Sequence, residues 1–312
     1  MNNTPVISNC VLLNACGAAY NIAPGTCTYT ADKIYSPNVP YTQGPQTACG
    51  GTKLINAATV GQTDSGIIVA FRGTLPPSES DPDSLFDWLQ DFFAEPATCT
   101  TGSFKVPGKV HSGFYHATTS IIEAVQALVA GYKPGPDNPV YVTGHSKGGA
   151  MASIGAYILS ENLGVPNVQP LVTFASPKPG DINFMGGFET VLSQTRYENY
   201  NDIVPLLPPS TEFIDLVVAV VNLIPYVGQK LAALFKSAEN WDYVPVGAME
   251  FVTSTHQVIS NETVEAQIWD VTKEFGEDLW TEDFSSFGVA HSLLPGNGYN
   301  SGICGAANKG SL

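Results

Sequence analysis

A serine between two glycines lies near the middle of the chain, in the sequence GHSKG at positions 144–148. The apolar, β-branched run 140–143 predicts a buried strand, and the small residues 149–152 predict a helix packed closely on a sheet. A G-x-S-x-G turn in this setting predicts a nucleophile elbow, which holds its serine in a strained conformation with the hydroxyl exposed. Ser146 is therefore a candidate nucleophile, and the backbone N–H of Lys147 is placed to donate to an oxyanion formed there. The alternative is a glycine-rich turn that only joins strand and helix.

The serine needs a base to take its proton, and the base is usually oriented by an acid. Behind an elbow serine the acid and then the histidine follow in the chain, so His256 and His291 are the candidate bases. His256 lies in the strand-like run 251–259, whereas His291 lies before a loop rich in proline and glycine. Because loops at the carboxyl edge of a sheet carry catalytic groups, we favour His291 and keep His256 as the alternative.

The candidate acid is Asp202, which directly follows a predicted strand at 196–200 and precedes a Val-Pro pair. This is the sheet edge at which the elbow also opens. Asp181 and Asp215 are alternatives, but the first lies in a predicted turn and the second within an apolar helix. A turn or helix-capping role for Asp202 is the competing interpretation.

Two further segments belong to the predicted site. The buried strand 66–71 runs into the turn 72–74, where a second oxyanion donor is expected. Beyond it, residues 75–83 are rich in proline, serine and aspartate, and residues 85–93 have the apolar spacing of a short amphipathic helix. We therefore predict a lid region at 75–93, with an ordinary connecting helix as the alternative.

Strands alternate with helices along the chain, which predicts an α/β fold with a mostly parallel mixed sheet and helices on both faces. Further strands are predicted at 170–175 and helices at 11–19 and 121–130. An apolar insertion at 211–240 predicts a helical hairpin, with helices at 213–224 and 227–235 separated at Pro225. Packing in the core and a cap over the active site are equally open for this hairpin. We expect one domain over 1–312, with residues 1–50 as an N-terminal wrap.

Composition limits the partners and the compartment. Acidic residues outnumber basic ones 28 to 13, giving a net charge of -15, which argues against nucleic acid and strongly anionic membranes. Six cysteines without metal-ligand spacing favour disulfides, so we expect an exported protein, with reduced buried cysteines as the alternative. Because residues 1–20 lack a signal-peptide pattern, the expected form is the mature secreted chain. No run approaches the ~18 apolar residues of a membrane span.

Several motifs together resemble the class 3, fungal-type triacylglycerol lipases of the α/β-hydrolase fold, a family that includes feruloyl esterases and some phospholipases A1. They are AFRGT at 70–74, DW at 87–88 before Asp91, VHSGF at 110–114, TGHSKGGA at 143–150, TFASP at 173–177, NYNDIVP at 199–205, and His291 with GIC at 302–304.

The resemblance implies a triad of Ser146, Asp202 and His291. It also implies an oxyanion hole of Thr74 and the Lys147 N–H. The lid it implies includes Phe86, Trp88 and Leu89, and the disulfide it implies joins Cys304 to Cys10, Cys16 or Cys27. More residues separate Asp202 from His291 than is usual in the family, and the excess is about the length of the 213–235 hairpin, so we interpret the hairpin as an insertion. If the hairpin were not an insertion, His256 would fit the family spacing instead.

The expected reaction is ester hydrolysis without a metal or other cofactor. The resemblance implies a monomeric lipase that meets fatty-acyl glycerol esters at a lipid–water interface, with transient contact to a membrane or droplet. An esterase for soluble esters, such as feruloyl esters, and a phospholipase A1 are the alternatives, and a non-catalytic lipid-binding protein is a remote one. Lys147 departs from the family, which usually has an apolar residue there. Its ammonium would pair with an acidic neighbour or favour a polar or phosphate-bearing substrate.

Overall fold

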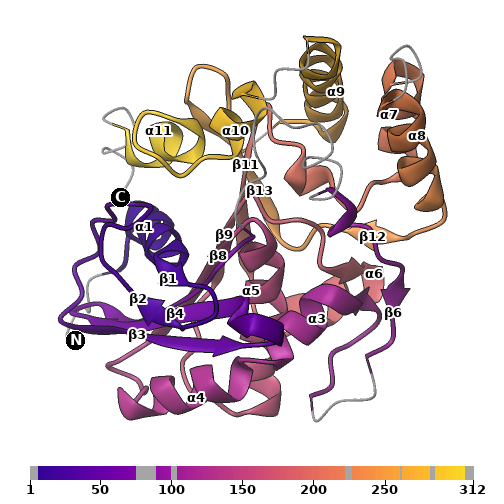
Figure 1. Ribbon diagram of the computed structural model, residues 1–312. Coiled ribbons are helices and arrows are strands. Elements are labelled where there is room, and N and C mark those ends of the chain that lie inside the picture. The colour runs from indigo at the N-terminus through magenta and orange to yellow at the C-terminus, as the bar shows by residue number, and fades with distance from the viewer. Residues whose placement is uncertain are drawn as a thin grey trace.

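The computed structural model describes residues 6–74, 89–99, 104–221, 227–260, 262–281 and 285–305 (Figure 1). Its main sheet has eight strands in the order β14-β13-β11-β9-β8-β5-β4-β3. The five strands from β13 to β5 run parallel, and the outer strands β14, β4 and β3 are antiparallel to their neighbours. This confirms the mostly parallel mixed sheet. The strands are β3 (Gln43–Gly50), β4 (Asn56–Thr63), β5 (Gly66–Phe71), β8 (Val140–His145), β9 (Leu171–Phe174), β11 (Gln194–Asn199), β13 (Ala248–Val252) and β14 (Val258–Ile259).

Alternate residues of β5 divide between two hydrophobic cores, because successive side chains of a strand point to opposite faces. Ile67, Val69 and Phe71 pack in the larger core with α3 (Ser112–Thr119), α4 (Ile122–Gly131) and α5 (Lys147–Tyr157). Ile68 and Ala70 pack in the smaller core with α1 (Asn9–Tyr20) and α11 (Gly298–Cys304). Helices therefore cover both faces of the sheet, as predicted (Figure 1).

The apolar insertion forms two packed helices, α7 (Thr211–Val221) and α8 (Val227–Ser237), and residues 222–226 between them lie outside the described part. One face of this hairpin, including Phe213 and Phe235, is buried in the larger core. The ring of Phe93 lies 5.2 Å from that of Phe235. Core packing is thus the correct interpretation for this face of the hairpin.

Further strands and helices that the sequence did not indicate complete the fold. A second sheet joins four two-residue strands in the order β12-β10-β7-β6, and β1 pairs with β2. These strands are β1 (Ile22–Ala23), β2 (Thr28–Tyr29), β6 (Pro96–Ala97), β7 (Val110–His111), β10 (Gly180–Asp181) and β12 (Tyr243–Val244). The remaining helices are η1 (Thr52–Leu54), η2 (Ile158–Asn162), α6 (Ile182–Glu189), η3 (Val204–Leu206), α9 (Val264–Thr281) and α10 (Ser285–His291). None of the described helices has the length and apolar character needed to cross a bilayer.

Disulfides tie down the N-terminal stretch. Cys10 bonds to Cys304, which selects one of the three expected partners, and Cys27 bonds to Cys49. Cys16 and Cys99 are buried free thiols, so only four of the six cysteines are bridged. The end of this stretch, β3, forms an edge of the main sheet.

Candidate active site

Ser146 lies on a strained turn between β8 and α5, with φ 58° and ψ -139°. A Cβ on Gly144 would lie 2.0 Å from the Gly148 carbonyl oxygen, and one on Gly148 would lie 2.2 Å from the Phe71 oxygen. Glycine is therefore required on both sides, and the turn has the strained strand–turn–helix geometry that the sequence predicts for a nucleophile elbow. The expectation of an exposed hydroxyl is wrong, because Ser146 is 0% exposed.

The chain packs closely around the serine hydroxyl. The Tyr20 hydroxyl and the Ser146 Cβ lie 2.1 and 3.0 Å from where a Cβ on Gly73 would stand. Within the described part of the chain, Ser146 Oγ has no partner in good hydrogen-bond geometry, although burial raises the pKa of the Tyr20 hydroxyl and the nearby Ser146 hydroxyl acts in the opposite direction. A serine oxygen left without a well-aligned partner in a buried site is unusual, and here it belongs to the candidate nucleophile.

Asp202 and His291 are brought together at the carboxyl end of β11. His291 Nδ1 lies 2.9 Å from Asp202 Oδ2 and 3.0 Å from Oδ1. Because a carboxylate only accepts, Nδ1–H is the donor, which leaves Nε2 to accept a proton in the neutral ring. Asp202 also accepts from the Val204 N–H at 3.0 Å and from the Tyr299 hydroxyl at 2.7 Å. The pair is therefore oriented and almost fully buried, as a general base and its acid require.

The other candidates lie elsewhere. His256 is exposed in the turn between β13 and β14 with φ 61°, so the expected strand through it is wrong. His291 is the last residue of α10, so the expected loop placement is wrong as well. Asp181 caps α6 by accepting from the Phe184 N–H at 2.9 Å, and Asp215 is exposed on α7. His291 is the histidine that the structure joins to Asp202.

The turn 72–74 lies beside the elbow, because β5 pairs with β8 up to Phe71 opposite Gly144. Arg72 is buried and donates from Nη1 to the Ile22 carbonyl at 2.6 Å and from Nη2 to the Ile55 carbonyl. These bonds fix the turn at the end of β5. Thr74, which follows Gly73, is partly buried. Its donor role stays a prediction.

Lys147 is held in place. Its Nζ donates to Asn56 Oδ1 at 3.0 Å, and burial lowers the pKa of the ammonium while the nearby Asp91 charge acts in the opposite direction. Asp91 is thus an acidic neighbour that favours the charged form of this ammonium, and a role of the ammonium in substrate choice stays a prediction.

Tyr20 and His145, which the sequence did not indicate as site residues, form a chain of hydrogen bonds to the backbone of His291. The Tyr20 hydroxyl lies 2.8 Å from His145 Nδ1, and His145 Nε2 lies 2.9 Å from the His291 carbonyl oxygen. The carbonyl must accept, so Nε2 carries the proton and Tyr20 donates to Nδ1. Burial, followed by the His291 charge, holds the pKa of His145 well below its usual value, so this ring is neutral. The chain of bonds ties α1 to the backbone of the candidate base.

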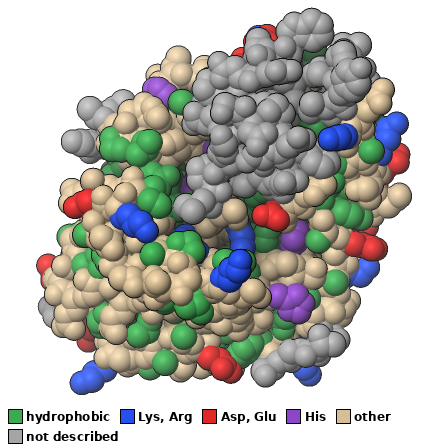
Figure 2. Space-filling model, in the orientation of Figure 1, with side chains coloured by type: hydrophobic (Ala, Val, Ile, Leu, Met, Phe, Trp, Pro, Cys, Tyr) green, Lys and Arg blue, Asp and Glu red, His purple; other side chains and the backbone are tan. Residues whose placement is uncertain are grey.

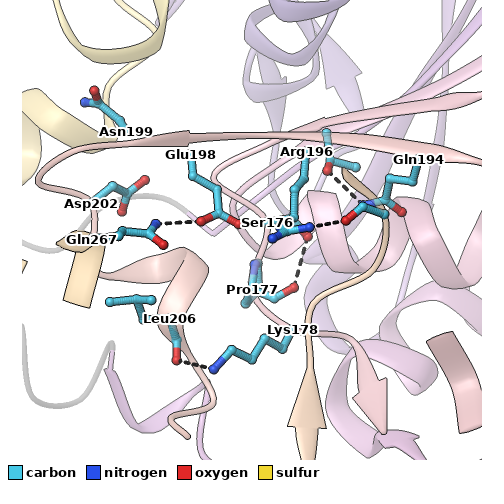
Figure 3. Close-up of polar contacts among 12 residues, drawn as sticks. Ser176, Pro177, Lys178, Gln194, Arg196, Glu198, Asn199, Asp202, Leu206 and Gln267 are labelled. Atoms are coloured by element: carbon cyan, nitrogen blue, oxygen red, sulfur yellow. Dashed lines mark hydrogen bonds and ion pairs between the residues drawn. The ribbon is translucent and has the colours of Figure 1, made fainter. Parts of the chain in front are cut away.

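A buried polar network fixes β11 next to Asp202 (Figure 3). Arg196 Nε donates to Glu198 Oε1 at 2.6 Å, and Gln267 of α9 donates to Glu198 Oε2 at 2.5 Å. Lys178 Nζ donates to the Leu206 carbonyl at 3.1 Å. These side chains hold the strand and the segment after it, which carry Asp202.

Of the predicted lid residues, Leu89 is described and fully buried, while Phe86 and Trp88 lie outside the described residues. The lid role thus stays a prediction. Within the described ranges, no three His, Cys, Asp or Glu side chains are grouped so that they could hold a metal ion.

Comparisons with known proteins agree with the family resemblance of the sequence motifs. The family model described as Lipase (class 3) matches residues 68–212. A secreted mono- and diacylglycerol lipase of Fusarium solani is 32% identical over 149 residues, which are 46% of this chain and 39% of that relative. A phospholipase A1-II 3 of Oryza sativa subsp. indica is 30% identical over 190 residues, covering 51% of this chain and 42% of that relative. The chain spans about two fifths of the length of these relatives.

The fold is also shared with solved structures. The triacylglyceride lipase of Rhizomucor miehei aligns with a TM-score of 0.53 at 24% identity, over 78% of this chain and 80% of that one. The resemblance of the chain to the class 3 lipases is thus confirmed over residues 68–212, on an α/β-hydrolase fold.

Proposed function

We propose that this protein is a serine hydrolase of carboxylic esters, and that it acts as a lipase on fatty-acyl esters of glycerol. The observation that carries the proposal is a serine on a strained elbow at the same sheet edge as a buried, hydrogen-bonded Asp–His pair. A merely structural turn would have no need of strain, and a buried Asp–His pair beside it matches what acyl transfer requires.

In the proposed mechanism Ser146 Oγ attacks the ester carbonyl carbon while His291 Nε2 takes its proton. The developing oxyanion accepts from the Lys147 N–H and from Thr74, each such donor being worth about 3 kcal/mol in comparable sites. His291 then protonates the leaving alcohol, and the acyl group stays on Ser146. A water molecule, deprotonated by His291, releases the fatty acid. Asp202 stays ionised and holds the imidazole in one tautomer.

The setting of this reaction is also a proposal. The secreted relative and the two disulfides support an extracellular protein. We infer that it works as a monomer on a lipid–water interface, with residues 75–93 as the lid. Leu89, within that segment, is buried in the larger core, and Phe93 at its end contacts Phe235 of the α7–α8 hairpin.

A phospholipase A1 is the second candidate, supported by the name of the Oryza sativa relative. It would use the same serine but would cleave the acyl ester of a phosphoglyceride. A dispersed phosphatidylcholine, offered in place of triacylglycerol, separates the two by which substrate is hydrolysed faster.

The test is the hydrolysis rate of a short-chain triacylglycerol as its concentration crosses the solubility limit. Ser146→Ala is expected to lower the rate at least about 10³-fold. Ser160→Ala is the matched control, because that hydroxyl donates to the adjacent Glu161 in an exposed hydrogen bond at the end of a helix, and its rate should equal that of the wild type. A rate that jumps when droplets form supports a lipase, and a smooth saturating curve supports a soluble-ester hydrolase. Full activity in Ser146→Ala would end the proposal.

A further inference from the structure

The backbone and the side chain of Lys147 contact different parts of the molecule. Its backbone N–H is the first of α5 and directly follows Ser146. Its side chain, however, runs away to β4, where Nζ donates to Asn56 Oδ1 at 3.0 Å. An ammonium is costly to bury without compensation, and an apolar side chain at this position would avoid that cost. The contacts of the ammonium should therefore have a use beyond stability.

The partner of the ammonium is itself held rigidly. Asn56 is buried, and its Nδ2 donates to Ser120 Oγ at 3.1 Å, which in turn donates to the Ala117 carbonyl at 2.7 Å. This chain of bonds fixes the orientation of the amide, so that its oxygen faces Lys147. The ammonium is thus hydrogen-bonded to an acceptor on β4 whose orientation is fixed by further hydrogen bonds.

Charges around the ammonium come from two directions. Asp91 attracts it and Arg72 repels it. Arg72 is occupied by two backbone carbonyls, whereas Asp91 lies in residues 89–93, which are held in the core by Leu89 and Phe92. On the face of the molecule drawn in Figure 2, blue, red and purple side chains lie close together near the centre of the view. The Lys147 ammonium therefore joins the first turn of α5 to β4 through a hydrogen bond, and the Asp91 charge in residues 89–93 favours its charged form.

We propose that the Lys147 side chain is a positioning residue of the oxyanion hole, which holds its own backbone N–H in line by linking α5 to Asn56. The inference rests on the proposed ester hydrolysis. A donor to the oxyanion acts in the transition state and not on the bound ester, so a misplaced N–H lowers kcat and leaves KM unchanged. A lysine that instead bound a phosphate group of the substrate would act on KM.

The test uses a soluble short-chain ester and five variants. Lys147→Met is expected to lower kcat about tenfold without a change in KM, because it removes a hydrogen bond from a charged group. Lys147→Arg restores most of the rate, since it keeps the charge and the donors. Asp91→Asn lowers kcat about threefold, and in Lys147→Met/Asp91→Asn the loss is no larger than in Lys147→Met alone, because the Asp91 charge acts only through the ammonium. Lys273→Met is the matched control, since that lysine pairs with Glu277 on an exposed face of α9.

Three results would overturn the inference. They are a kcat of Lys147→Met equal to that of the wild type, an increase in KM as the main effect, and a double variant whose loss is the product of the single losses. All three presuppose an active wild type with an inactive Ser146→Ala, so they leave the proposed function intact. A wild type that hydrolyses no ester would overturn the proposed function and this inference together.

Discussion

Tyr299→Phe removes a single oxygen atom that the structure places between the candidate acid and the backbone. The hydroxyl donates to Asp202 Oδ2 at 2.7 Å and accepts from the Asn199 N–H at 3.1 Å, and the residue is fully buried. Burial, and then the Asp202 charge, raise the pKa of Tyr299 well above its usual value, so the hydroxyl keeps its proton and remains a donor.

The size of the effect follows from these two bonds. A hydrogen bond to a charged group contributes about 1.5–3 kcal/mol, and a buried N–H left without an acceptor costs about 1–3 kcal/mol. Because the two losses share one atom, we expect the free energy of unfolding to fall by about 3 kcal/mol, which lowers Tm by roughly 6 °C. Asp202 keeps its bonds to His291 and to the Val204 N–H, so kcat should fall only about tenfold, far less than the ~10⁴-fold loss typical of replacing a triad aspartate.

The assay is thermal unfolding together with kcat on a soluble ester. Tyr197→Phe is the matched control, because its buried hydroxyl accepts from Asn9 Nδ2 at 2.7 Å without touching the triad. It should lose stability and retain kcat. If Tyr299→Phe also retained the kcat of the wild type, the hydroxyl would serve only the fold, and the argument that it orients Asp202 would be refuted.

Two further predictions concern stability. Burial lowers the pKa of His111 to about 4, so the folded state prefers the neutral ring; this stabilisation, at most about 3 kcal/mol, is complete above pH 6.5 and is lost as the pH falls towards 4. Urea unfolding of His111→Phe should therefore depend less on pH between 6.5 and 4 than that of the wild type, and parallel curves would contradict this. Cys10→Ser/Cys304→Ser removes the disulfide between α1 and α11 and should cost about 2–5 kcal/mol, measured against a wild type kept oxidised. An unchanged Tm would show that the helices hold each other without the bond.

Local patterns were sufficient for much of the site. The elbow is predictable because two glycines at fixed distances from Ser146 are demanded by contacts that a Cβ would violate. Asp202 is predictable because it follows β11, a strand that pairs in the sheet with the apolar strands β9 and β13. His291 contacts Asp202, but the sequence predicts a loop there, because a seven-residue helix containing Gly288 has little periodic signal.

The rest depends on contacts between distant segments. Tyr20 and Tyr299 reach the triad only because α1 and α11 pack on the same face of the sheet, which no local pattern reports. The burial of Ser146 has the same origin. The strands of the second sheet have two residues each, too few for an alternation to be recognised. The roles of Thr74 and of the lid residues, and the single-domain organisation, stay predictions.

The disulfide between Cys10 and Cys304 joins α1 to α11, so it can form only after both helices have been synthesised. One hydroxyl behind the active site is carried by the helix that contains Cys10 and the other by the helix that contains Cys304. During synthesis Tyr20 leaves the ribosome early, and its helix can pack on β5 and β8, but its contact with α11 cannot form until Tyr299 has followed. The catalytic groups of a growing chain would thus be assembled without their full support until the two helices have met.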